Sequence, residues 1–99
     1  MALYLDVKLR MARVIFTTTL CRHVDCPETE APGTTVREVL DAVFAVNDRI
    51  RDYVLDDQAA LRKHMTILVD GLRLKDRNGL SDPVGEASEI YVMQALSGG

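Results

Sequence analysis

The stretch GTTVREVLDAVF, residues 33–44, sets the requirements for the rest of the fold. Thr35 is followed three positions later by Glu38, a capping box in which each side chain can satisfy a free backbone N–H at a helix start. Apolar residues then recur at helical spacing and form one stripe: Val36, Val39, Leu40, Val43 and Phe44. Arg37, Glu38 and Asp41 lie on the opposite side. The stretch therefore predicts an amphipathic helix that covers a flat apolar surface.

Two β segments are predicted before this helix. RVIFTTT, residues 13–19, is rich in β-branched residues and predicts a strand. Residues 20–31 are expected to turn and return as its antiparallel partner. Pro27 and Pro32 indicate that the returning strand is short or lies at a sheet edge, because proline cannot donate a hydrogen bond to the ladder.

After the helix, residues 47–63 are more polar and predict a short helical or irregular connector, with four apolar anchors: Ile50, Val54, Leu55 and Leu61. MTILVD, residues 65–70, predicts a strand, and Asp70-Gly71 predicts a two-residue hairpin into a short strand at residues 72–74. The turn-forming pairs Asn78-Gly79 and Asp82-Pro83 predict a loop at residues 76–85. EIYVMQAL, residues 89–96, predicts the last strand.

The predicted elements run strand, strand, helix, strand, short strand, strand, without an internal repeat. This order predicts an α+β fold in which one main helix packs across one face of a mixed sheet. Parallel pairing of the first and last strands at the centre would make it a β-grasp, or ubiquitin-like, fold. We expect a β-grasp domain at residues 11–96 and a flexible Gly-Gly tail at residues 97–99.

Residues 1–10 carry a strand-like alternation of their own, in which Tyr4, Asp6, Lys8 and Arg10 separate apolar residues. Met11-Ala12-Arg13, which resembles the start of a protein chain, follows directly. Three interpretations stay open for this N-terminal extension: an extra edge strand, a dimer contact or an appended segment.

Composition narrows the possible partners and location. The 99 residues fit one domain, with 47% apolar and 27% charged residues. The net charge of −3 and the scattered basic residues argue against nucleic acid as a partner and suit a basic protein. No apolar run is long enough to cross a bilayer, so we expect no membrane partner. Asp6 and Lys8 interrupt the continuous apolar stretch that a signal peptide would need. We therefore expect a cytoplasmic protein.

Cys21, His23 and Cys26 are the obvious candidates for a metal site or a Cys–His nucleophile. A structural zinc site needs four ligands, and the other histidine, His64, is remote in the sequence. No nucleophile motif surrounds the cysteines. We therefore expect no metal site and two reduced thiols.

The informative feature is the end of the chain, where the last predicted strand leads into Gly98 and Gly99. A glycine pair has no side chains and lets a partner's backbone approach closely, so the terminal carboxylate could reach the ATP site of another protein. Adenylation would give the carboxylate a good leaving group, and a sulfur nucleophile would then yield a thiocarboxylate. The alternative interpretation is an inert tail or a cloning remnant.

The order of five segments resembles the MoaD/ThiS family of sulfur carriers: MARVIF, GTTVREVLDAVF, VDG, GLSDPV and EIYVMQALSGG. The resemblance covers nearly all of residues 11–99. It implies a co-substrate rather than an enzyme, in which Gly99, preceded by Gly98, carries the adenylate and then the thiocarboxylate. It also implies an adenylating partner related to ubiquitin-activating enzymes that uses ATP, a persulfide sulfur donor and a sulfur-acceptor enzyme, with no cofactor bound to the carrier itself.

The resemblance further implies a partner-binding surface on the sheet face away from the helix. Five residues are assigned to it: Thr17, Tyr91, Met93, Leu96 and Ser97. Alternation sends Ile90 and Val92 inward beneath the helix. Exposed tyrosine and methionine are typical of interfaces, but Tyr91 and Met93 could equally be covered by the N-terminal extension.

Three hypotheses for function stay open. The first is a sulfur carrier; its long connector at residues 47–63 favours molybdopterin-type or cysteine biosynthesis over thiamine biosynthesis. The second is a ubiquitin-like modifier, in which a lysine amine takes the place of the sulfur nucleophile. The third is a non-catalytic β-grasp binding module with an inert tail.

Overall fold

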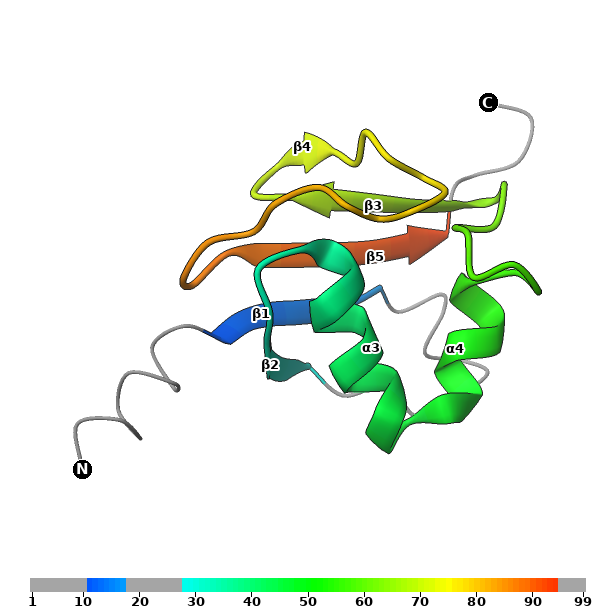
Figure 1. Cartoon of the computed structure of the whole chain (residues 1–99), viewed down its shortest axis with the longest axis horizontal. Coiled ribbons are helices and arrows are strands. Elements are labelled where there is room, and N and C mark those ends of the chain that lie inside the picture. Colours follow the sequence, from blue (N-terminus) through cyan, green and yellow to red (C-terminus); the bar gives the residue numbers. More distant parts are fainter. Residues whose placement is uncertain (1–10, 18–27, 95–99) are drawn as a thin grey trace.

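The computed structural model describes residues 11–17 and 28–94, which form a five-stranded sheet covered by two helices (Figure 1). In chain order the elements are β1 (Met11–Phe16), β2 (Thr29–Pro32), α3 (Val36–Val46), α4 (Asp48–Val54), β3 (Met65–Val69), β4 (Leu72–Arg73) and β5 (Glu89–Gln94). Residues 18–19 and 95–96 of the predicted strands lie outside the described residues.

The sheet has the strand order β2-β1-β5-β3-β4. β1 and β5 run parallel at its centre, with Arg13 paired to Glu89 and Phe16 to Val92. β2 is an antiparallel edge strand, as the two prolines predicted, and β3 and β4 are antiparallel to their neighbours. This mixed sheet with helices on one face confirms the predicted α+β, β-grasp fold.

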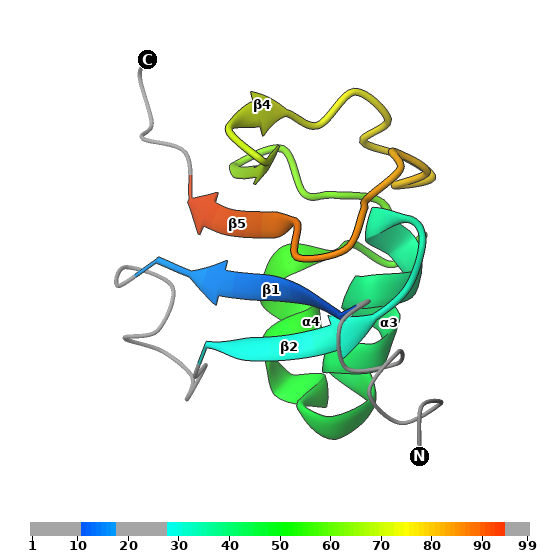
Figure 2. The ribbon, with the colours of Figure 1, turned by 90° about the vertical axis from the view of Figure 1, so that its left-hand side faces the viewer.

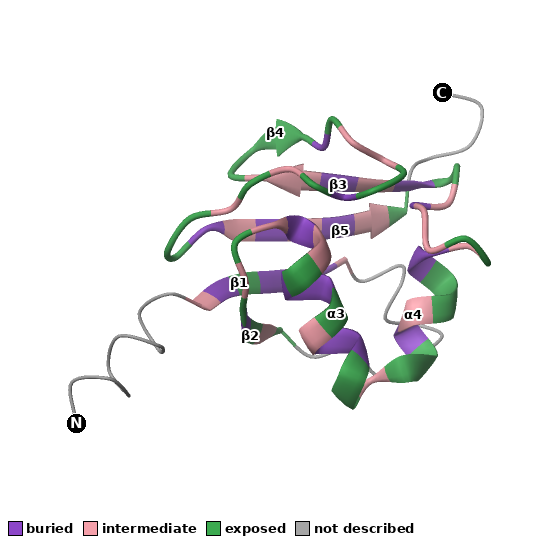
Figure 3. Cartoon of the chain, in the orientation of Figure 1, coloured by how far each residue is buried: buried purple, intermediate pink, exposed green. Residues whose placement is uncertain are grey.

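The core lies between the sheet and the helices, as the purple bands of Figure 3 show. The whole predicted stripe of α3 is buried, from Val36 to Phe44. It packs with inward residues of the two central strands, all buried: Ala12, Val14, Phe16, Ile90 and Val92. The period of two in the strands and the helical period in α3 therefore meet in one apolar layer.

The start of α3 differs in one detail from the predicted capping box. The Thr35 hydroxyl accepts a hydrogen bond from the Glu38 N–H at 3.2 Å, as predicted. The Glu38 carboxylate, however, accepts from the N–H of Thr34 at 2.7 Å and from its hydroxyl at 2.9 Å, one residue before the N-cap. The first two N–H groups of the helix, those of Val36 and Arg37, donate to the carbonyls of Asp82 and Leu80 in a loop that is remote in the sequence.

The connector contains a second, shorter helix, α4, followed by a loop that a bridge between Leu55 and Leu61 closes. All four predicted anchors are buried. Two arginines tie the neighbouring loops together: Arg37 donates to the Ala59 carbonyl at 2.7 Å, and Arg77 to the Arg62 carbonyl at 2.7 Å. Among the described residues, no helix is long and apolar enough to cross a membrane.

The predicted hairpin joins β3 to β4. Asp70 and Gly71 have φ angles of 51° and 87°, as a two-residue turn with positive φ at both positions requires. The Asp70 carboxylate also accepts from the N–H of Glu89 at 2.9 Å and from the hydroxyl of Ser88 at 3.0 Å. The hairpin is thereby fixed to the start of β5.

Candidate functional site

One face of the sheet is left uncovered by any element that the structure describes, because both helices pack on the other face (Figure 2). Strand pairing decides which side chains share this uncovered face. Ile15 and Leu68 both pair with Tyr91, and Thr66 pairs with Met93. Together with Thr17, which follows β1 at the same alternation, these half-buried residues form what we term the open face: Ile15, Thr17, Thr66, Leu68, Tyr91 and Met93.

Three of the residues assigned from the sequence lie on this face. Tyr91 and Met93 are half-buried, while Ile90 and Val92, which alternate with them, are fully buried under the helices, as alternation predicted. The backbone N–H of Thr17 donates to the Val92 carbonyl at 3.1 Å. Within the part of the chain that the structure describes, the Thr17 hydroxyl is buried and has no hydrogen-bond partner.

The other assigned positions cannot be placed. Leu96, Ser97, Gly98 and Gly99 lie outside the described residues, and so do Cys21, His23 and Cys26. Within residues 11–17 and 28–94, no group of acidic, histidine or cysteine side chains is arranged to hold a metal ion.

Sequence reasoning missed half of the open face: Ile15, Thr66 and Leu68. The sequence pattern that could have identified them is the alternation of residues along the two strands at residues 13–19 and 65–70. Alternation shows that such residues share a face within a strand, but only the pairing register brings three strands together on one surface.

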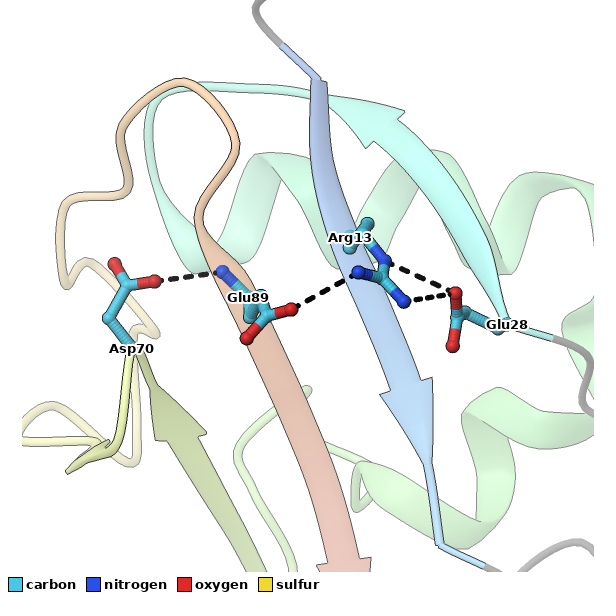
Figure 4. A network of polar contacts seen from close by, with 4 residues as sticks. All are labelled: Arg13, Glu28, Asp70 and Glu89. Carbon is cyan, nitrogen blue, oxygen red and sulfur yellow. Dashed lines mark hydrogen bonds and ion pairs between the residues drawn. The ribbon is translucent and has the colours of Figure 1, made fainter.

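The open face has two different ends because β1 and β5 are parallel. At the end where both strands finish lie Thr17 and Met93, followed by Gln94, the last described residue of β5. At the end where both strands start lies a polar network centred on Arg13 (Figure 4). Along the direction of β5 the open face therefore passes from a charged end to an uncharged end with Thr17, Thr66 and Met93. The exposed Arg73 pairs with Leu68 and lies at the β4 edge of the face.

We term the residues around Arg13 the charged end: Arg13, Glu28, Glu30 and Glu89. The Arg13 guanidinium donates to Glu28 from Nε at 3.1 Å and from Nη2 at 2.5 Å, and from Nη1 to Glu89 at 3.2 Å (Figure 4). The hydrogen bond and the charge of Glu28 raise the pKa of Arg13. The three side chains are 43–51% exposed, so these ion pairs shape the surface more than they stabilise the fold.

Glu30 completes the charged end because it pairs directly with Arg13 across β1 and β2 and is exposed. Among the described residues it makes no hydrogen bond or ion pair with a side chain that could neutralise it. Among the described residues, three carboxylates and one guanidinium therefore share this end, and the described part of it carries a net negative charge.

Solved structures of small proteins share this fold. SAMP1 of Haloferax volcanii superposes with a TM-score of 0.74 at 18% identity, over 90% of this chain and 99% of its own. A chain of the BexX/CysO complex of Amycolatopsis orientalis gives 0.74 at 24% identity, over 89% and 99%. CysO of Mycobacterium tuberculosis, an antigen, gives 0.72 at 19% identity, over 86% and 99%.

No family model and no curated protein sequence matches the chain. The structural likeness covers nearly the whole length of these proteins, and at this level of identity it concerns the fold. The chain therefore has the β-grasp, ubiquitin-like fold of SAMP1 and CysO.

Proposed function

We propose that the protein is a sulfur carrier whose working group is the carboxylate of Gly99. The observation that carries this proposal is the position of β5: a central strand of the sheet ends at Gln94, and the sequence continues into Ser97-Gly98-Gly99. The Gly99 carboxylate follows this central strand by five residues, so the chain keeps it within about 18 Å of the end of β5. The likeness to CysO and the sequence resemblance to sulfur carriers support the same assignment.

The proposed chemistry needs partners but no catalytic group in the carrier. The Gly99 carboxylate displaces pyrophosphate from ATP in an adenylating enzyme and becomes an acyl-adenylate. The terminal sulfur of a persulfide donor attacks the acyl carbon and expels AMP. A thiol then cleaves the resulting acyl disulfide and forms a new disulfide with the donor, which leaves the thiocarboxylate on Gly99. The carrier is consumed and regenerated as a co-substrate.

The open face is the proposed docking surface for the adenylating enzyme. Tyr91, Met93 and Leu68 are half-buried in the free chain and offer apolar area, and tyrosine and methionine are enriched in interface cores. Thr17 would contribute its backbone and methyl group, because its hydroxyl is enclosed. Leu96 and Ser97 would bridge the docked face and the reacting carboxylate.

Intact mass tests the carrier assignment. The full chain is incubated with its adenylating enzyme, ATP, a persulfide donor and a thiol. We expect a gain equal to the mass difference between sulfur and oxygen, located at Gly99 by fragmentation. A matched chain with one alanine added after Gly99 should gain nothing. An unchanged mass of the parent chain, or equal gains in both chains, would overturn the proposal.

A second candidate function is a protein modifier, because the fold is also that of small archaeal modifier protein 1. The same adenylate would then be attacked by a lysine amine and form an isopeptide bond. The last basic residue is Arg77, so trypsin would leave residues 78–99 on a modified lysine. Chymotryptic cleavage after Leu96 would leave Ser97-Gly98-Gly99, and finding this remnant on lysines distinguishes the modifier from the carrier.

For the acceptor we propose an enzyme of cysteine or molybdopterin-type cofactor biosynthesis. The length of the connector at residues 47–63, which folds into α4 and an anchored loop, supports this choice over the compact thiamine carriers. The test is transfer of labelled sulfur from the loaded chain to each acceptor system in turn.

A further inference from the structure

We infer that the adenylating partner meets the open face with basic side chains placed opposite the charged end, and that Glu30 guides this encounter. The inference rests on the proposed function and adds to it the chemistry and the orientation of the partner surface. It follows from the distribution of charge along the open face, of which Figure 4 draws the ion pairs of Arg13.

The open face has a direction. Its uncharged residues occupy the middle and the ends of β1 and β5, and the charged end lies beside their starts. A partner protein could dock on an apolar patch alone in many rotations about the centre of the patch. A net negative group at one end only gives the surface a direction, so a partner with basic groups at the matching end binds in one orientation.

Two carboxylates of the charged end are held in place by hydrogen bonds. Arg13 fixes Glu28 through two of its nitrogens, and its third nitrogen reaches Glu89. The N–H of Glu89 is held in turn by the Asp70 carboxylate at 2.9 Å. Carboxylates held in place before the encounter lose less side-chain entropy when a cation binds them.

Glu30 can be changed without removing a hydrogen bond of this network. It is exposed on the edge strand β2 and lies outside the hydrogen bonds of Arg13. Glu30→Lys therefore reverses a charge of the charged end without removing a group that is hydrogen-bonded to Arg13. Asp41→Lys makes the same change on the outer side of α3, at an exposed position away from the open face, and is the matched control.

The experiment measures kcat/KM for adenylation of the full chain at several salt concentrations. For Glu30→Lys we expect a loss of roughly five-fold at low salt, carried by KM, that shrinks as salt screens the charges. Asp41→Lys should stay within about two-fold of the parent chain.

The outcomes separate this inference from the proposed function. An adenylated parent chain with equal effects of Glu30→Lys and Asp41→Lys would overturn the inference and keep the carrier assignment. A loss that does not depend on salt, or a gain for Glu30→Lys, would also overturn it. Absence of adenylation in the parent chain would overturn the proposed function, and the inference would fall with it.

Discussion

At the scale of single residues, Gly33 shows how closely the chain packs where it enters α3. A Cβ atom at this position would lie 2.8 Å from the Cβ of Glu38 and 2.8 Å from the backbone nitrogen of Val39. These atoms belong to the first turn of the helix and cannot move aside without disrupting it. The φ of 153° adds strain for any residue with a side chain.

We therefore expect Gly33→Ala to lower the free energy of unfolding by about 2–4 kcal/mol, measured by urea denaturation. Gly85→Ala is the matched control, since its added Cβ would meet only the Ser88 hydroxyl, at 3.8 Å. That variant should stay within about 0.5 kcal/mol of the parent. Equal stability of the two variants would show that the approach of Gly33 to α3 is not tight in solution.

We expect Asp76 to make the stability of the fold depend on pH. Its carboxylate accepts from the Ser81 hydroxyl at 2.6 Å and from the Gly79 N–H at 2.9 Å, and these bonds lower its pKa from 3.8 to about 2. Because the folded pKa lies below the unfolded one, the stabilisation is present above about pH 4 and is lost as pH falls toward 2. Hydrogen bonds from Thr34 lower the pKa of Glu38, and the hydrogen bond from the Ala60 N–H lowers that of Asp56. Both contributions to stability are therefore also lost as the pH falls.

We expect Asp76→Asn to melt below the parent chain near neutral pH, and the difference in Tm to narrow steadily as pH falls through that window. Thermal unfolding followed by circular dichroism at a series of pH values measures this. A difference in Tm that stays constant with pH would mean that the lowered pKa of Asp76 does not contribute.

At the scale of elements, α3 is the part of the fold on which the core depends. Val43 is 4% exposed and faces the sheet. Val43→Asp would place an unpaired carboxylate in the core and should destabilise the domain by about 4 kcal/mol or more. Circular dichroism melting measures this, with Ala45→Asp on the exposed side of the same helix as the control. Cooperative melting of Val43→Asp near the parent temperature would contradict the assigned helix face.

Elements fixed by local sequence were predicted well. The apolar stripe of α3 and the Asp70-Gly71 turn depend on residues at most a few positions apart, and both form as expected. The Thr35 half of the capping box also forms, whereas the Glu38 carboxylate accepts from Thr34. The hydrogen bonds from Val36 and Arg37 to carbonyls of residues 80–82 were not predicted, because that loop is remote in the sequence. The Arg13 network was missed for the same reason: Arg13 and Glu89 are 76 positions apart.

At the scale of the whole molecule, docking and chemistry are expected to reside in separate parts of the chain. The open face belongs to the packed sheet, whereas the proposed reacting group follows it in the sequence. A chain that lacks Gly98 and Gly99 should keep the stability of the parent, because removing terminal glycines takes almost no apolar area from the core. It should also keep the docking surface while losing all sulfur loading.

Such a shortened chain should therefore inhibit adenylation of the full chain by competing for the same enzyme surface. The rate of pyrophosphate release from the full chain, measured with increasing amounts of the shortened chain, gives this inhibition directly. Adding Met93→Lys to the shortened chain should abolish it, because a lysine replaces apolar contact area on the open face. Failure of the shortened chain to inhibit, well above the KM of the full chain, would mean that the terminal glycines and not the open face supply the binding energy.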